Sequence, residues 1–152
     1  MRLVFSFLVL AMILNGCNPT PQAPAAPSVA ELKPDFKPTV DARGLMTAIV
    51  IPTSDVLFEV GSKPPADEKA WAAVQNAAVT LAESGNLLMI GSRAKPEAAW
   101  MQFSRAMTEA AEIAVKAAQD KKVDDVLAAG DKIYMSCENC HNQYMDKGSG
   151  GK

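Results

Sequence analysis

Apolar residues recur every three or four positions along most of the chain beyond residue 40, which is the spacing of one face of an α-helix. The pattern predicts four helices, over residues 41–61, 65–84, 96–120 and 123–144. The expected inward face of the first helix consists of Leu45, Met46, Ile49, Val56, Leu57 and Val60. Four amphipathic helices joined by short connections predict an all-α fold, an antiparallel four-helix bundle.

Residues with special backbone properties indicate the helix ends. Asp41 is the expected N-cap of the first helix, because its carboxylate can accept a hydrogen bond from a free N–H of the first turn. Pro52 cannot donate to the carbonyl of Ala48, so we expect the helix to kink or restart there. Gly85 is expected to end the second helix, since glycine is common just beyond a helix C-terminus. The alanines of the third helix would let another helix, or a flat ligand, approach closely.

The first 16 residues have the layout of a secretory signal peptide. Arg2 precedes an apolar stretch from Leu3 to Leu14, which is short for a bilayer span. The sequence Leu-Asn-Gly-Cys that ends at Cys17 resembles the cleavage box of bacterial lipoproteins, and this resemblance implies lipidation of Cys17. Asn18 after the cysteine favours the outer membrane over the inner one. A buried N-terminal helix is the alternative interpretation.

The distribution of proline divides the remaining chain. Six of the ten prolines fall between residues 18 and 38, and such a segment is extended and builds no core. We therefore expect residues 17–40 to be a lipidated stalk, residues 41–147 a helical domain, and residues 148–152 a flexible tail. The net charge of −2 argues against a nucleic-acid partner. No nucleophile array or phosphate loop is evident, so the protein is not expected to be an enzyme.

The most informative residues are Cys137, Cys140 and His141, which form the sequence C-x-x-C-H. This is the attachment motif of c-type haem. Cysteines three residues apart on a helix point the same way and can add to the two vinyl groups of one porphyrin, while the histidine on the same face reaches the iron. A covalent link keeps the haem in place in an oxidising compartment outside the cytoplasm. The sequence therefore predicts one covalently bound haem c.

Other uses of the same residues fit the surrounding sequence less well. A thioredoxin-like dithiol would need its cysteines at the start of a helix in a βαβ setting. A zinc site would need a fourth strong ligand, and no other histidine or cysteine is free. A disulfide between Cys137 and Cys140 would work against helical geometry.

The place of the motif on the last of four helices resembles the class II c-type cytochromes, the cytochrome c-prime family, over roughly residues 40–146. The residues that carry the resemblance are the C-x-x-C-H-x-x-Y sequence at 137–144 and a first helix bearing Met46. The resemblance implies a four-helix haem bundle. The family commonly has a basic residue after the aromatic one, where this chain has Met145, and a lipoprotein leader is not general in the family.

The sixth iron ligand is left open by the motif itself. His141 is the only histidine, so the position is filled by methionine, lysine or a small molecule, or is empty. Met135 and Met145 lie on the haem-binding helix and cannot reach across the ring. The methionines elsewhere in the domain are Met46, Met89, Met101 and Met107. The start of the first helix should adjoin the end of the fourth, and low-spin members of the family take their ligand from this region, so Met46 is the predicted ligand.

These observations lead to one main functional hypothesis and two alternatives. The main one is a membrane-tethered, periplasmic monohaem cytochrome that transfers electrons, with its iron held by His141 and Met46. Its partners would be periplasmic or membrane redox proteins and, through acylated Cys17, the lipid bilayer; a homodimer is a further option. The first alternative is a five-coordinate protein that binds nitric oxide or carbon monoxide. The second is an interaction lipoprotein whose haem is mainly structural.

Overall fold

The computed structural model describes residues 36–145, and this part of the chain contains helices and no strand. The predicted signal peptide, Cys17 and most of the stalk lie outside the described residues, as does the tail. The elements in chain order are α1 (Ala42–Leu45), the π-helical turn η2 (Met46–Val50), α2 (Ile51–Phe58), η3 (Glu59–Gly61), α3 (Glu68–Leu88), η4 (Gly91–Arg93), α4 (Ala98–Gln119) and α5 (Val123–Tyr144).

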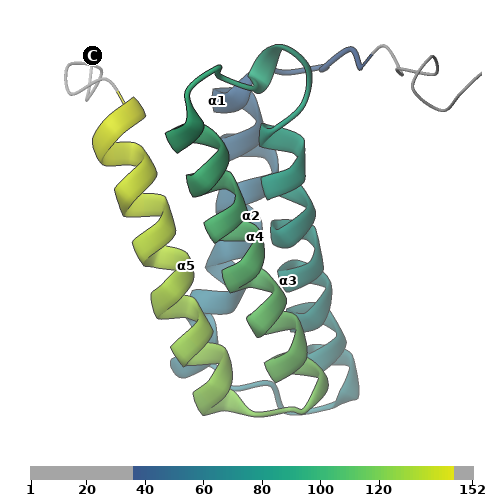
Figure 1. The fold of residues 1–152 in the computed structure, drawn as a ribbon. Helices are drawn as coiled ribbons and strands as arrows, with labels where there is room; N and C mark the ends of the chain where they lie inside the picture. Colours follow the sequence, from purple (N-terminus) through teal and green to yellow (C-terminus); the bar gives the residue numbers. More distant parts are fainter. Residues whose placement is uncertain (1–35, 146–152) are drawn as a thin grey trace, which may run out of the picture. The chain divides into compact units, whose positions relative to one another are not determined.

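The elements form a bundle of four helical rods, of which α1, η2, α2 and η3 together make the first. Each rod contacts two others: α3 packs against α2 and α4, and α5 packs against α4 and α2. Successive connections lie at alternating ends, so that the start of α1 and the end of α5 come to the same end of the bundle (Figure 1). The expectation of an all-helical bundle is confirmed.

The first rod changes its helical geometry just before Pro52. Asp41 caps α1 as predicted, with its carboxylate accepting from the Gly44 N–H at 2.8 Å. The chain then makes a π-helical turn, in which the Ile51 N–H bonds to the Met46 carbonyl, and α2 restarts with Pro52 as its second residue. A proline is tolerated in the first turn of a helix, because the N–H it lacks has no partner there.

The π-helical turn also changes which residues of this rod face the core. The buried positions are Leu45, Val50, Ser54, Leu57 and Val60. The five-residue step after Leu45 spans the wider turn, so the inward face moves from Ile49 to Val50. The predicted core position Val56 is wrong, since this side chain is 37% exposed.

The predicted end of the second helix at Gly85 is also wrong, because α3 continues to Leu88. Gly85 is buried inside the helix, where a Cβ would lie 2.1 Å from Thr108 Oγ1 and 2.8 Å from the Ser104 carbonyl oxygen on α4. The Thr108 hydroxyl donates to the Ala82 carbonyl across the same interface, at 3.2 Å. Glycine is therefore required here for close helix packing and not for termination.

Alanine is the commonest buried residue of α3 and α4. The buried alanines of the two helices are Ala77, Ala78, Ala82, Ala110, Ala111, Ala114, Ala117 and Ala118. Of the two roles expected for the alanines of the third helix, close approach of another helix is the one seen, because α4 packs extensively on α3 and α5.

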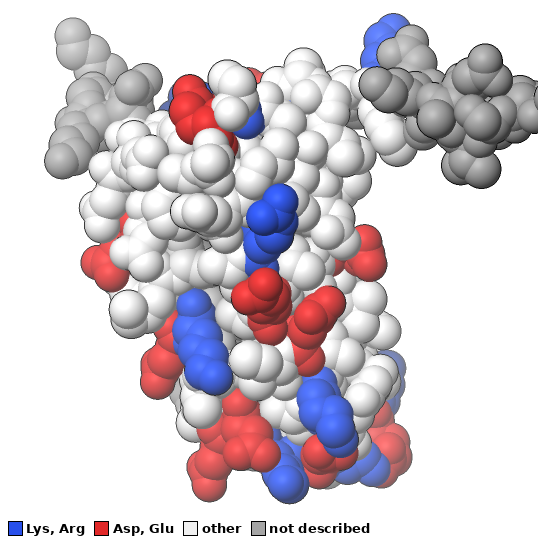
Figure 2. Space-filling view, viewed as in Figure 1, with Lys and Arg blue, Asp and Glu red and all other residues white. Residues whose placement is uncertain are grey.

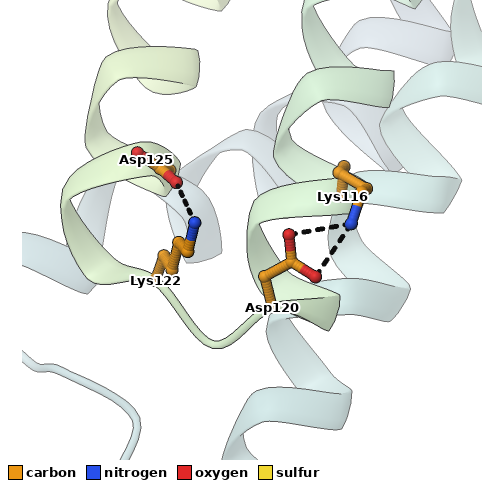
Figure 3. A network of polar contacts seen from close by, with 4 residues as sticks. All are labelled: Lys116, Asp120, Lys122 and Asp125. Carbon is orange, nitrogen blue, oxygen red and sulfur yellow. Dashed lines mark hydrogen bonds and ion pairs between the residues drawn. The ribbon is translucent and has the colours of Figure 1, made fainter.

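The turn from α4 to α5 is fixed by backbone and ionic contacts. Lys121 has a positive φ of 55°, and the N–H groups of Lys121 and Lys122 bond back to the Ala118 and Ala117 carbonyls, which is a Schellman motif. Figure 3 shows the Lys116 ammonium group between both carboxylate oxygens of Asp120, each at 2.8 Å. This hydrogen bond lowers the pKa of the Asp120 carboxyl below its ordinary value.

Candidate functional site

A pocket of about 260 Å³ lies between the first rod and α5. The first rod contributes one wall, the second half of α5 the other, and α4 with the end of α3 the floor. Its lining consists of Met46, Val50, Ile51, Ser54, Phe58, Leu88, Phe103, Ser104, Met107, Tyr134, Ser136, Cys137, Cys140 and His141. Most of the lining lies in the half of the bundle where α1 starts and α5 ends, and Ser54 and Phe58 extend it past the middle of the first rod.

All four residues predicted to hold the haem line this one pocket. Cys137, Cys140 and His141 come from consecutive turns of α5, and Met46 comes from the first residue of η2 on the facing rod. The two cysteines are half-buried and His141 is exposed at the pocket. The bundle thus brings a thioether from one end of the described chain to two thiols and an imidazole from the other.

The two thiols are free and poorly suited to redox exchange as a dithiol. Burial raises the pKa of the Cys137 thiol, and it also raises the pKa of the Cys140 thiol, where the charge of Cys137 adds to the effect. Reactive dithiols depend on a lowered pKa and stand near the start of a helix. These cysteines lie near the end of α5, so the structure does not favour the dithiol alternative.

A zinc site has no support in this part of the chain. Among residues 36–145, no group of three or more histidine, cysteine, aspartate or glutamate side chains is arranged to hold a metal ion. The donor groups that line this pocket are two thiols, one imidazole and two thioethers.

The serine hydroxyl groups inside the pocket are already engaged in hydrogen bonds. The hydroxyl groups of Ser54, Ser104 and Ser136 donate to backbone carbonyls of their own helices, at 3.0, 2.8 and 2.7 Å. The remaining wall and floor residues, apart from those of the motif, are aliphatic, aromatic or thioether side chains. Such a lining suits a large apolar ligand more than a polar substrate.

The structure reduces the number of methionines that could reach a ligand in the pocket. Met46 is half-buried in the wall facing the C-x-x-C-H motif, and Met107 is 5% exposed in the floor. Met89 and Met101 do not line the pocket. Met46 and Met107 are therefore the two thioethers available from the described residues.

An aromatic cluster packs behind the last turn of α5. The ring of Tyr144 meets those of Trp100 and Phe103 edge to face, with centroid distances of 5.1 and 6.3 Å. The Trp100 indole N–H donates to the Leu88 carbonyl at 2.9 Å, which ties the start of α4 to the end of α3. The Lys95 ammonium group lies over two of these rings, 5.5 Å from that of Trp100 and 5.3 Å from that of Tyr144.

Sequence reasoning missed several residues of the site. Phe58 and Tyr134 line the pocket although their side chains are 41% and 59% exposed, and Lys95, from a connection between helices, lies over the rings of Trp100 and Tyr144 at the last turn of α5. The periodicity of one helix identifies its buried face, but it does not show which exposed residues border a pocket shared with another helix. Lys95 belongs to no periodic segment, so no sequence signal could have found it.

Charge is distributed unevenly over the molecule. Figure 2 shows that, on the face in view, most acidic and basic side chains gather over the half of the bundle where α4 turns into α5, while the half toward the end of α5 is largely uncharged. The charged groups of that turn include the pair formed by Lys116 and Asp120 and the contacts of Lys121 with Glu68 and of Lys122 with Asp125. The pocket thus lies toward the end of the bundle with fewer charges on this face.

Comparison with known proteins gives no relative: no protein-family model, curated protein or solved structure significantly matches this chain. By length and composition alone, the rod Ala42–Gly61 could cross a membrane, with a mean hydropathy of 1.3. The core helix of a soluble protein passes the same test, and the buried face of this rod packs against α3 and α5.

Proposed function

We propose that this protein is a c-type cytochrome that carries one covalent haem and transfers electrons. The observation that carries the proposal is the pocket in which Met46 faces Cys137, Cys140 and His141. Two free thiols, an adjacent imidazole, an opposing thioether and apolar walls are the donor set and the surroundings that a haem requires. The bundle would then be an antiparallel one of the class II cytochrome type.

Each of these residues has a distinct task in the proposal. Cys137 and Cys140 would hold the haem through two thioether links, formed when each S–H bond adds across a vinyl group with its hydrogen going to the vinyl carbon. His141 would supply a nitrogen donor and Met46 a sulfur donor to the iron, and a thioether favours the reduced metal. The apolar walls limit the access of water. Haem itself supplies a one-electron couple between ferric and ferrous iron.

The location of the protein is part of the same proposal. The N-terminal sequence favours export and lipidation at Cys17, so that the bundle would face the periplasm from a bacterial membrane, with the outer membrane favoured by Asn18. A lipid anchor holds the protein at the surface where it meets redox partners. The exposed position of His141 at the pocket suits electron exchange with periplasmic or membrane proteins there.

Covalent haem is tested by expressing the full chain in a host that matures c-type cytochromes. The wild-type band should stain for haem peroxidase activity after denaturing electrophoresis, and the Cys137→Ala, Cys140→Ala double variant should not. Met135→Ala is a matched control, because this side chain is 57% exposed on the same helix and lies outside the pocket lining. It should stain like the wild type.

Two results would overturn the proposal. One is a colourless wild-type protein that is nevertheless helical by circular dichroism. The other is a double variant that still holds haem after denaturation. Binding of nitric oxide or carbon monoxide is the competing function of a haem-loaded pocket, and the Met46 variant described in the Discussion separates the two.

A further inference from the structure

Lys95 places a positive charge against the last turn of α5. Its ammonium nitrogen lies 5.3 Å from the centre of the Tyr144 ring and 5.5 Å from that of Trp100. Both distances are within the roughly 6 Å over which a cation is attracted to an aromatic face. The ammonium group is therefore held by two rings at once, although the residue itself is exposed.

The two rings that hold the charge are themselves fixed. Trp100 is only 5% exposed, and its indole N–H is bonded to the Leu88 carbonyl at 2.9 Å. Tyr144 meets Trp100 edge to face at 5.1 Å. Tyr144 also follows Cys140 by four residues on the same helix, which is about one turn. The charge thus has a defined place beside the attachment motif.

The charge of Lys95 is not neutralised by a close carboxylate. None of the ion pairs found among residues 36–145 involves Lys95. Glu97 is close enough for its charge to raise the pKa of the Tyr144 hydroxyl, after the larger effect of burial. The ring that Lys95 contacts, that of Tyr144, lies one helical turn from Cys140, so the charge stands beside the attachment motif.

We propose that Lys95 is a positioning residue of the haem site, which holds the last turn of α5 through Tyr144 and favours the reduced iron through its charge. This inference rests on the proposed function. When a redox partner delivers one electron, the positive charge of the centre falls by one and no bond is broken. A fixed cation nearby opposes the oxidised state more than the reduced one, so its presence raises the reduction potential.

The test compares the reduction potentials of haem-loaded variants by spectroelectrochemistry. Lys95→Gln should shift the equilibrium toward ferric iron by roughly two- to tenfold, as expected for the loss of one charge near a partly solvated site. Lys95→Arg should stay close to the wild type, because a guanidinium group keeps the charge and stacks on aromatic rings. The shift in Lys95→Gln should shrink as salt is added.

Lys69→Gln is the matched control. It removes the same charge from an exposed lysine in the first turn of α3, at the opposite end of the bundle. Its potential should stay at the wild-type value. The near-ultraviolet circular dichroism of Trp100 and Tyr144 should change in Lys95→Gln and not in Lys95→Arg. This signal monitors the packing of the last turn of α5 independently of the iron.

The inference is wrong if haem-loaded Lys95→Gln keeps the wild-type potential, or if Lys69→Gln shifts it equally. It is also wrong if Lys95→Arg behaves like Lys95→Gln. A failure of the proposed function looks different, because the wild-type protein would then hold no covalent haem and no potential could be measured.

Discussion

The two sides of α4 differ in how closely they are packed. One side packs tightly against α3, and these two helices form a frame; the other side borders an open pocket. On the side facing α3, buried alanines and Gly85 let the helices approach until no room is left for a Cβ. On the other side, Phe103 and Met107 form the floor of a pocket of about 260 Å³ between the first rod and α5. Small side chains make the contact with α3 close, and large ones border the space for a ligand on the other side.

Ser104 links the two regions. Its backbone carbonyl is one of the atoms that a Cβ at position 85 would meet, at 2.8 Å, and its side chain lines the pocket. The distance between α3 and α4 therefore sets the position of the pocket floor. Changes in the frame should be costly for stability, whereas changes in the pocket should be costly mainly for ligand binding.

Gly85→Ala should have the largest effect on stability. The new Cβ would meet Thr108 Oγ1 and the backbone of Ser104, and only the former can rotate away. Overpacking costs roughly 1–3 kcal/mol, while alanine gains up to about 1 kcal/mol over glycine within a helix. We expect the free energy of unfolding to fall by about 1–2 kcal/mol, as measured by urea denaturation of the haem-loaded protein.

Gly130→Ala is the matched control for this prediction. Gly130 is also buried within a helix, but a Cβ there would meet only the Phe58 ring at 3.6 Å, which is an ordinary contact. Its free energy of unfolding should therefore rise by up to about 1 kcal/mol through helix propensity. Equal changes in the free energy of unfolding in the two variants would contradict the conclusion that the contact between α3 and α4 is packed more tightly than the pocket side.

The sequence predicted the helices of the bundle better than it predicted the contacts between them. The third and fourth helices begin and end within two residues of the predicted positions, because each buries a regular stripe that is visible in the periodicity. Gly85 was misplaced because the residues that require glycine, Ser104 and Thr108, lie on another helix. Val56 was misplaced because the π-helical turn before Pro52 rotates the rest of the rod, and no local pattern announces a change of helical type.

Met46→Ala tests the pocket side of the comparison. Replacing a fully buried methionine by alanine lowers the free energy of unfolding by at least roughly 2 kcal/mol. Because Met46 is only half-buried, we expect a smaller decrease of about 1 kcal/mol. If its sulfur is an iron ligand, the ferric spectrum should change from low spin to high spin and the reduction potential should fall. Carbon monoxide should then bind rapidly. The two thioether links to α5 should still retain the colour.

Met107→Leu serves as the comparison for Met46, because it is the other thioether of the pocket. Leucine preserves the volume of this buried side chain, and the spectrum should remain low spin. A spectral change in Met107→Leu and none in Met46→Ala would assign the ligand to α4. A wild-type protein that is already high spin and binds carbon monoxide rapidly would favour gas binding over electron transfer.

The site was predictable to the extent that its chemistry is local. The C-x-x-C-H sequence needs only helical spacing, whereas the choice of Met46 combined the argument that the first rod begins where the last one ends with the resemblance to the class II cytochromes. Neither Phe58 in the pocket lining nor Lys95 beside the last turn of α5 could be predicted, since both belong to elements whose own patterns carry no sign of a ligand. Residues that shape a pocket from outside its main helix depend on tertiary packing, which periodicity does not contain.

The smallest expected effect concerns the charged turn between α4 and α5, away from the pocket. Lys116 lowers the pKa of the Asp120 carboxyl below its ordinary value of 3.8, mainly through the hydrogen bond at 2.8 Å. A carboxyl group whose pKa is lower in the folded state than in the unfolded state stabilises the fold at pH values above its unfolded-state pKa. This stabilisation is lost as the pH falls through its folded-state pKa.

Lys116→Met should therefore raise the pKa of Asp120 in an NMR titration and slightly lower the melting temperature at pH 7, with the difference from wild type vanishing in acid. Lys132→Met, an exposed lysine of α5 that forms no ion pair among the described residues, should leave the Asp120 titration unchanged. An equal shift in both variants would mean that overall charge, and not the Lys116 contact, sets the pKa of Asp120.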